Sequence, residues 1–330
     1  MAMQIADFME EWRSPSDFIH VQTSGSTGTP KPMLVEKRRM LASARRTCDF
    51  LGLREGDSAL LCMPLDYIAG KMMVVRSIER GLRLVNVPPS GHPLAKVDTA
   101  ETLSLVAMVP LQVYNTLQEP REAAVLRQCR HLLIGGGAID DGLSAALRTF
   151  PNAVWSTYGM TETLSHIALR RLNGEEASSW YTPFPSVALS LSPEGCLVID
   201  APEVCATTLT TNDIAELRAD GRFRILGRKD NTICSGGIKI QAEELERQLR
   251  PHLHQPYLIT SLPDHKFGEV VVLLTEGSAD EARQICAAVL PKYHQPRLCL
   301  HIDRIPLTET GKPARQQAKD IIKVCQKTDF

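Results

Sequence analysis

The sequence predicts an α/β protein with a large domain, built on a layered, largely parallel sheet and an antiparallel β subdomain, and a small, mobile α+β C-terminal domain. Two observations lead to this. Over the first half of the chain, short apolar runs alternate with segments of helical period, which is typical of a parallel sheet covered on both faces. From Pro183 to Arg228, short alternating runs are separated by Pro-Glu-Gly and Asp-Gly turns, which indicates antiparallel strands.

The elements of the first half follow in order. Residues 18–22 are expected to form a strand, and residues 37–50 have the period of an amphipathic helix. Residues 58–64 predict a buried strand, and the helix after it should end at Gly81. Further strands are expected at RLVNVP, LSLVAMVP and HLLIGG. Ligands of such sheets bind beyond the carboxyl ends of the strands, so the loops there are the candidate functional positions.

The C-terminal part has its own order of elements. Helices are predicted at 241–249, 280–289 and 314–324, and strands at YLITSL, EVVVLLT and LCLHI. The domain boundary is placed near Asp230. We therefore expect a large domain over 1–229 and a small lid domain over 230–330.

Composition limits the possible partners and the compartment. The 330 residues carry a formal net charge of -1, which gives no global electrostatic case for nucleic acid or a membrane surface. The nine cysteines are scattered and never form a C-x-x-C pair, which favours reduced thiols over disulfides or a zinc site. Asp7, Glu10 and Glu11 stand where a signal peptide would be basic and then apolar. We expect a soluble cytoplasmic protein with no nucleic-acid or membrane partner.

The stretch TSGSTGTPK, residues 23–31, predicts a phosphate-binding loop. It combines hydroxyl donors, glycines that let backbone N–H groups approach a ligand, and a closing lysine. It is not the P-loop pattern, because Lys31 lies between two prolines. A flexible serine-glycine linker is the alternative. The strand before the stretch and the β-patterned KPMLVE after it favour phosphate binding.

This stretch resembles the phosphate-binding loop of the adenylate-forming superfamily, which contains acyl-CoA ligases, luciferases and peptide-synthetase adenylation domains. Four further segments resemble its motifs in the same order: STYGMTET (156–163), TTND (210–213), GRKDNTICSGGIKI (227–240) and PLTETGKPAR (306–315). The resemblance implies an enzyme that couples a carboxylic acid to ATP, with Mg²⁺, giving an acyl-adenylate and pyrophosphate. A thiol, usually that of coenzyme A, then displaces AMP.

The resemblance also implies roles for the matching residues. Thr161, Glu162 and Lys312 would be catalytic: Thr161 would hydrogen-bond the α-phosphate, Glu162 would help to hold Mg²⁺, and Lys312 would stabilise charge on the phosphoryl group in the transition state. Residues from five segments would bind ATP: Thr23, Ser24, Gly25, Ser26, Thr27, Gly28, Lys31, Gly135, Gly136, Gly137, Thr157, Tyr158, Gly159, Thr161, Asp213 and Arg228. Two alternatives stay open, since Tyr158 could be a core tyrosine and residues 135–139 a simple turn.

Three of these expectations concern the second half of the chain. Asp213 would accept both ribose hydroxyls; the family usually has glycine before this aspartate, and here it is Asn212, which tolerates a left-handed backbone. Asp230 would be the hinge about which the lid rotates between the two half-reactions. Ser235, Gly236 and Gly237 would form the glycine loop along which coenzyme A passes.

For the acid, the segment TYGMTETLSHIA resembles the o-succinylbenzoate–CoA ligases of menaquinone synthesis. That substrate keeps one ionised carboxylate while the other is activated, so its pocket needs a cation or strong donors. Tyr67, Lys71, Ser165 and His166 are the candidates. Lys71 could equally be a surface lysine, and His166 a core histidine.

The alternatives are a CoA ligase or carrier-loading enzyme for another aryl or short acid, and an inactive nucleotide-binding protein. The chain departs from the family in one respect: only 22 residues precede Thr23, where typical members carry an N-terminal subdomain. Apolar surface that such a subdomain would cover invites self-association, so a homodimer is a further expectation.

Overall fold

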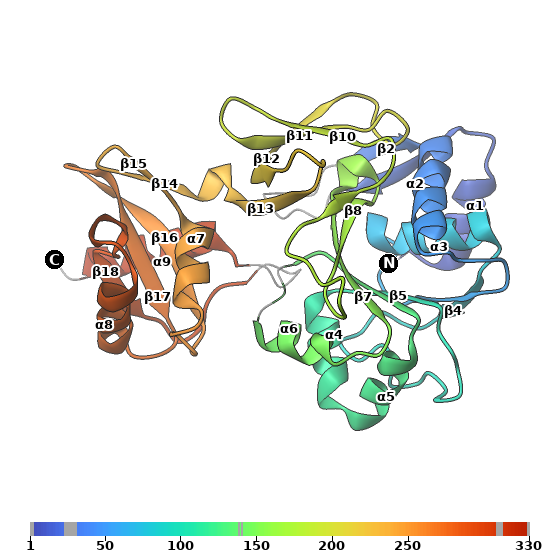
Figure 1. Ribbon diagram of the computed structural model, residues 1–330, viewed down its shortest axis with the longest axis horizontal. Helices are drawn as coiled ribbons and strands as arrows, with labels where there is room; N and C mark the ends of the chain where they lie inside the picture. Colours follow the sequence, from blue (N-terminus) through green and yellow to red (C-terminus); the bar gives the residue numbers. More distant parts are fainter. Residues whose placement is uncertain (1–2, 23–31, 138, 140, 308–312, 329–330) are drawn as a thin grey trace. The chain divides into compact units, whose positions relative to one another are not determined.

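Figure 1 shows the computed structural model, which describes residues 3–22, 32–137, 139, 141–307 and 313–328. These residues form four sheets, of seven, two, four and five strands. The chain divides into two compact units. The first comprises 1–189, 199–209 and 217–223, and the second comprises 190–198, 210–216 and 224–330.

The seven-stranded sheet has the order β4-β3-β5-β6-β7-β8-β9. All pairs from β4 to β7 are parallel, and β8 and β9 are antiparallel additions. The predicted, largely parallel sheet is therefore confirmed, and the carboxyl ends of β3, β5, β6 and β7 share one edge. The strands are β3 (Ser58–Leu61), β4 (Arg83–Asn86), β5 (Leu105–Met108), β6 (His131–Ile134), β7 (Ala153–Gly159), β8 (His166–Arg171) and β9 (Thr182–Pro183).

Helices cover both faces of this sheet, as strands that are buried throughout require (Figure 1). α4, α5 and α6 pack on the face that carries Val106 and Leu132, while α2 and α3 pack together on the other face. Gly81 ends α3 in the left-handed conformation (φ 65°), as predicted. The helices are α2 (Lys37–Phe50), α3 (Ile68–Arg80), α4 (Pro110–Gln118), α5 (Pro120–Gln128) and α6 (Asp141–Arg148).

The chain begins with a helix and a hairpin. α1 (Ile5–Arg13), which the sequence analysis did not predict, buries Phe8 completely. β1 (Phe18–Gln22) pairs antiparallel with β2 (Pro32–Glu36) in a separate two-stranded sheet, with Gln22 opposite Pro32. The predicted phosphate loop connects these two paired residues and lies outside the described residues.

The four-stranded sheet follows the order of the chain: β10 (Ala188–Leu191), β11 (Cys196–Asp200), β12 (Leu209–Leu217) and β13 (Phe223–Arg228). Short turns join its strands, with Ser192 N–H donating to the Cys196 carbonyl and Arg218 N–H donating to that of Arg222. The predicted antiparallel subdomain is confirmed.

The five-stranded sheet contains β17 (Gly268–Thr275), which pairs antiparallel with β16 (Tyr257–Asp264) and β14 (Thr232–Ser235) and parallel with β18 (Leu298–His301). β15 (Ile238–Gln241) continues the sheet beyond β14. One apolar cluster joins it to α7 (Ala242–Leu249) and α8 (Ala279–Val289), and another to α9 (Arg315–Thr328). The predicted α+β elements are confirmed, while the boundary at Asp230 and the mobility of this part stay predictions. Among the described residues, no helix combines the length and the apolar character needed to cross a membrane.

Candidate functional site

The glycine run after β6 lies directly beside β7. Because β6 and β7 are parallel neighbours, Gly135 comes next to Thr157, and a Cβ added at Gly135 would approach the Thr157 Oγ1 atom to 2.4 Å. No larger residue fits there without displacing that hydroxyl. Bare backbone and a hydroxyl therefore lie together at the carboxyl edge of the sheet, where an adenine wall is predicted; the contact with adenine stays a prediction.

Tyr158 lies in an aromatic group with Tyr181 and Phe223. Its ring centroid is 5.8 Å from that of Tyr181 and 5.1 Å from that of Phe223, which it meets edge-on. The Tyr181 hydroxyl is 2.8 Å from Ser156 Oγ, which fixes this group to β7. Tyr158 remains half-buried rather than enclosed, so both predicted interpretations of it, adenine platform and core residue, are compatible with its position.

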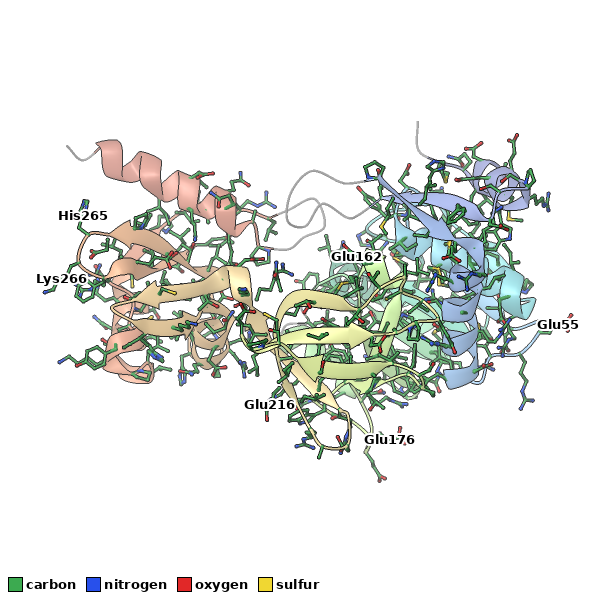
Figure 2. All side chains as sticks on the ribbon, turned by 90° about the horizontal axis from the view of Figure 1, so that it is seen from above. Glu55, Glu162, Glu176, Glu216, His265 and Lys266 are labelled. Carbon is green, nitrogen blue, oxygen red and sulfur yellow. The ribbon has the colours of Figure 1, made fainter. Side chains whose placement is uncertain are left out.

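Beyond β7, a short 3-10 turn (Thr161–Thr163) presents Glu162 to solvent (Figure 2). Thr161 is buried and Glu162 is exposed, and no cation among the described residues pairs with the Glu162 carboxylate. The next residue after the turn, Leu164, has φ 65°, which is rare for a bulky residue and indicates local strain. This bend starts β8, so that Ser165 and His166 follow within a few residues of Glu162.

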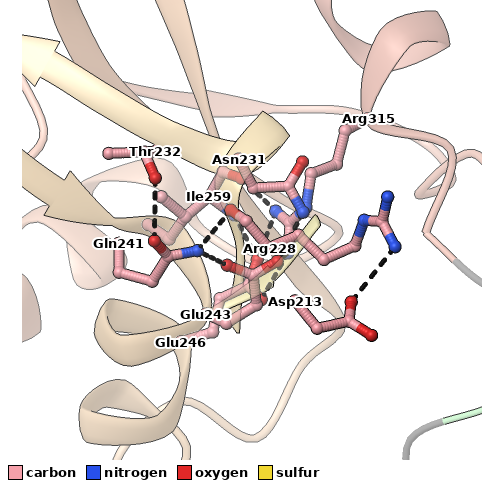
Figure 3. Close-up of polar contacts among 9 residues, drawn as sticks. All are labelled: Asp213, Arg228, Asn231, Thr232, Gln241, Glu243, Glu246, Ile259 and Arg315. Atoms are coloured by element: carbon pink, nitrogen blue, oxygen red, sulfur yellow. Dashed lines mark hydrogen bonds and ion pairs between the residues drawn. The ribbon is translucent and has the colours of Figure 1, made fainter. Parts of the chain in front are cut away.

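Arg228 bridges two predicted site residues in the second unit, Asp213 and Asp230, and Figure 3 shows its contact with Asp213. Its Nη1 atom donates to Asp213 Oδ1 at 3.2 Å, and its Nη2 atom donates to Asp230 Oδ2 at 2.9 Å. Thr211 orients Asp213 by accepting its N–H at Oγ1 (3.0 Å), and Asn212 donates to Asp230 at 3.3 Å. The predicted ribose acid and the predicted hinge acid thus share one guanidinium, while their functional roles stay predictions.

The predicted coenzyme A loop is the turn of a β-hairpin. Ser235 pairs with Ile238, and the two residues between them, Gly236 and Gly237, have φ values of 58° and 84°. Two successive positive φ values match a type I′ turn, for which glycine is strongly preferred. The sequence analysis predicted the glycines but not the strands β14 and β15 around them. Binding of coenzyme A here stays a prediction.

Of the residues predicted for the acid, the structure places Lys71 apart from Ser165 and His166. Lys71 is 2% exposed, and its Nζ atom donates to the His20 carbonyl at 2.6 Å. Tyr67 is the residue before α3 and is half-buried. As a ligand of the acid, each of these residues stays a prediction.

Ser165 and His166 instead contact an arginine that the sequence analysis missed. Arg76, on α3, is 3% exposed and donates from Nη2 to Ser165 Oγ at 2.6 Å. No carboxylate among the described residues forms an ion pair with it, and its buried Nε atom has no hydrogen-bond partner among them. The signal in the sequence was an arginine at the end of the apolar run MMVVR, which a purely structural helix would fill with an apolar residue.

A chain of hydrogen bonds continues from Arg76. Ser165 Oγ lies 3.3 Å from His166 Nδ1, and His166 Nε2 lies 3.0 Å from Thr47 Oγ1, which donates to the Ser43 carbonyl at 3.2 Å. Because Thr47 uses its proton on Ser43, His166 must donate from Nε2 and accept at Nδ1. Burial, with the Arg76 charge as a second cause, holds the pKa of His166 well below its usual value, so this imidazole is neutral.

The root of the predicted lysine loop is held by Arg315, which forms a two-pronged ion pair with Glu246, with both N···O distances at 2.8 Å (Figure 3). Ala314 N–H donates to the Pro306 carbonyl, and Leu307 pairs with Pro313. Residues 308–312 between them lie outside the described residues. The predicted site residues that lie outside the described part of the chain are Thr23, Ser24, Gly25, Ser26, Thr27, Gly28, Lys31 and Lys312.

Known proteins match this chain in sequence and in fold. The AMP-binding enzyme family profile matches residues 5–201. A 2-succinylbenzoate–CoA ligase of Bacillus cereus is 26% identical, over 96% of this chain and 72% of the relative. An acyl-CoA synthetase (AMP-forming)/AMP-acid ligase II-like protein from Dyadobacter fermentans DSM 18053 is 32% identical with a TM-score of 0.66, over 96% of this chain and 92% of that one. The O-succinylbenzoate coenzyme A synthetase (MenE) of Bacillus subtilis, solved with ATP and magnesium ion, is 24% identical with a TM-score of 0.76, over 91% and 69%.

Proposed function

The chain belongs to the AMP-binding enzyme family, and from that premise we propose that it ligates o-succinylbenzoate to coenzyme A. The family and the CoA ligase relatives make the protein an acid–thiol ligase. Naming o-succinylbenzoate as the acid goes beyond the family assignment, because the 2-succinylbenzoate–CoA ligase relatives are only about one quarter identical to this chain. It needs support from residues of this chain.

The observation that supports this acid is the buried guanidinium of Arg76. Burial lowers its pKa only to about 10, so it stays charged at neutral pH. A buried charge without an opposite charge is costly, which makes the Arg76 guanidinium a candidate partner for an anionic ligand. An acid with a second carboxylate supplies an anion that a fatty acid lacks. We propose the Arg76 guanidinium as the donor for this anion, with the half-buried Ser165 holding it in place.

The hydrogen-bond chain behind Ser165 fixes its proton. Ser165 accepts from Arg76 and donates to the neutral His166, so its oxygen can still accept a hydrogen bond but has no proton left to donate. A substrate carboxylate would therefore be bound mainly by the Arg76 guanidinium, whose Nε–H has no hydrogen-bond partner among the described residues. Arg76 thus carries the charge recognition, and Ser165 and His166 hold it in place.

In the first step, a carboxylate oxygen of the acid attacks the α-phosphorus of ATP, and the bond to pyrophosphate breaks. Glu162 fits a role in holding Mg²⁺, because its exposed carboxylate has no described cation as a partner and Mg²⁺ prefers oxygen ligands together with water. When bound, Mg²⁺ would neutralise phosphate charge. Thr161 and Lys312 are proposed to hydrogen-bond the α-phosphoryl group, and Asp213 and Arg228 to hold the ribose.

In the second step, the thiol sulfur of coenzyme A attacks the acyl carbon, and AMP leaves. We propose that Asp230 is the hinge between the steps and that the turn at Gly236 and Gly237 lies along the pantetheine. Rotation there would break or rebuild the Arg228–Asp230 bond, which joins the hinge to the ribose acid. A cytoplasmic location, a place in menaquinone biosynthesis and a homodimer complete the proposal.

The test is ATP–pyrophosphate exchange with a panel of acids, followed by CoA-dependent release of AMP. We expect exchange with o-succinylbenzoate and much weaker exchange with benzoate, succinate and hexanoate. Exchange with another aryl acid alone would contradict o-succinylbenzoate as the substrate and would leave the assignment as an acid–thiol ligase intact. Exchange with no acid, in protein that still binds ATP, would point to the nucleotide-binding alternative.

A further inference from the structure

The backbone of His20, in the middle of β1, is held by two side chains. In an antiparallel pair, backbone groups alternate between the partner strand and the outer edge. Among the described residues β1 has β2 as its one strand partner, so its other edge needs different partners. The His20 N–H donates to Glu11 Oε1 at 2.8 Å, and its carbonyl accepts from Lys71 Nζ at 2.6 Å.

The two side chains come from different helices. Glu11 lies on α1 and also contacts the His20 ring at Nδ1 (2.9 Å), while Lys71 lies on α3. Phe8 of α1 covers Lys71, with the ammonium 5.9 Å from the ring centroid. One residue of β1 is therefore fixed to both helices.

Burying Lys71 needs a reason other than packing. The side chain is 2% exposed, and burial lowers the pKa of Lys71, while Glu11 and Asp66 partly offset this. A methionine would fill the same volume without the cost of desolvating an ammonium. On α3, Lys71 is five residues before Arg76, which places the two about 140° apart around the helix. The Lys71 ammonium accordingly faces β1 and not the Arg76–Ser165 group.

The segment that follows β1 suggests a function for these contacts. Two residues after His20, Gln22 pairs with Pro32, and the predicted phosphate loop joins this pair. We propose that Lys71 and Glu11 are positioning residues for ATP. By hydrogen-bonding the backbone of His20, they fix the β1–β2 pair against α3 and α1. They thereby also fix Gln22 and Pro32, the two residues from which the predicted nucleotide loop starts and to which it returns. This rests on the proposed function, and it gives Lys71 a role in binding ATP where the sequence predicted one in binding the acid.

The experiment measures ATP affinity without acid, by calorimetry, and the KM of o-succinylbenzoate in pyrophosphate exchange. Lys71→Met should weaken ATP binding about tenfold, the usual scale for loss of one hydrogen bond from a charged donor, and change the KM of the acid less than about twofold. Glu11→Ala should act in the same direction, and Glu11→Gln, whose amide oxygen can still accept the His20 N–H, should stay close to the wild type. Lys96→Met, at an exposed position, is the matched control.

The two single changes should not add. Because both act through His20, the double variant should bind ATP little worse than Lys71→Met alone. Amide hydrogen exchange at residues 20–22 should become faster in Lys71→Met, which reports the positioning directly. If Lys71→Met does not fold, Glu11→Ala carries the same test from a partly exposed side chain.

The outcomes are distinct. Unchanged ATP affinity in Lys71→Met and Glu11→Ala, in a wild type that binds ATP, would overturn this proposal and leave the ligase assignment intact. A rise in the KM of the acid with unchanged ATP affinity would contradict this proposal and support the predicted role of Lys71 in binding the acid. Equal losses for ATP and acid together with a lower melting temperature would reduce its role to general stability. A wild type that does not bind ATP would overturn both proposals.

Discussion

The Nη2 atom of Arg76 lies 2.6 Å from the Oγ atom of Ser165, although the two residues are 89 positions apart in the chain. The contact joins the middle of α3 to the start of β8, just beyond the strained Leu164. It places the buried, positively charged guanidinium of Arg76 close to the turn that carries Glu162. This charge should affect both the choice of acid and the stability of the free protein.

Arg76→Met should lower kcat/KM for o-succinylbenzoate far more than for an acid with one carboxylate. Removing one partner from a buried ion pair costs about 3–5 kcal/mol, or roughly 10²- to 10⁴-fold in kcat/KM. The effect of the same variant on a one-carboxylate acid should be within a few-fold. Pyrophosphate exchange with both acids measures the difference, and equal losses would show that Arg76 does not recognise the second carboxylate.

The same variant should not lose stability in the absence of substrate. The free protein has no described carboxylate to compensate the Arg76 charge, so an apolar side chain of similar length removes a desolvation cost. We expect an unchanged or slightly raised melting temperature for Arg76→Met, measured by calorimetry without ligand. Arg80→Met is the contrasting variant, because Arg80 is paired with Asp49 and Glu79 on the surface side of the same helix. A drop of several degrees in Arg76→Met would mean that the guanidinium is a structural element.

The fold could be predicted where local pattern decides it. The helix over 37–50 and the strand over 18–22 have their predicted bounds, because amphipathic period and alternation were both clear. α1, a helix of nine residues, was not predicted. β14 and β15 were missed because each has only four residues, although Ile233 and Ile240 alternate with polar residues on either side of Gly-Gly, a pattern typical of a hairpin.

The site was predictable in its motifs and not in its side-chain directions. The glycines at 135–137 and Thr157 could be named because their segments resemble motifs of the adenylate-forming superfamily, and their roles stay predictions. The direction of Lys71 depends on its contact with His20, and that contact exists only once α3 and β1 are packed. Arg76 resembles any helical arginine until its burial is known. The contact of Lys71 and the burial of Arg76 both depend on tertiary packing, which no local sequence pattern encodes.

Acidification should destabilise the protein through two histidines, the buried His166 and the partly exposed His131. Burial lowers the pKa of His131 to about 4 and that of His166 well below the usual value. Below about pH 6.5 the unfolded chain takes up protons at these positions that the folded chain does not, so stability present at neutral pH is lost as the pH falls. For the enclosed His166 the slope is up to about 1.4 kcal/mol per pH unit, and for the partly exposed His131 it is smaller.

Denaturant unfolding between pH 8 and pH 5 measures this dependence. His166→Gln should flatten the decline in the free energy of unfolding, whatever its effect at pH 8, and His131→Gln should do so to a lesser degree. His265→Gln, which changes an exposed side chain (Figure 2), should follow the wild-type slope. A His166→Gln variant with the wild-type slope would show that this imidazole is protonated in the folded protein.

Glu162→Gln should raise the Mg²⁺ concentration needed for half-maximal exchange. An amide oxygen still coordinates but carries no charge, so we expect a shift of about tenfold that excess Mg²⁺ partly overcomes. Titration of exchange activity with Mg²⁺ at saturating ATP measures it. Glu176→Gln, at an exposed carboxylate, is the control. A loss of rate that no Mg²⁺ concentration reverses, with an unchanged midpoint, would give Glu162 a role other than holding the metal.

Lys312→Ala should separate the two half-reactions. Its loop is rooted by the Arg315–Glu246 ion pair, and a lysine delivered to the α-phosphoryl group would stabilise charge that exists only while AMP is transferred. Loss of such a group should lower pyrophosphate exchange about 10³-fold, by comparison with other phosphoryl-transfer sites. Formation of thioester from supplied acyl-adenylate and coenzyme A should stay within a few-fold of the wild type, as should both reactions in Lys292→Ala, at an exposed position. Equal losses in both half-reactions would mean that the lysine acts on a step common to them, and the alternation about Asp230 would lose its basis.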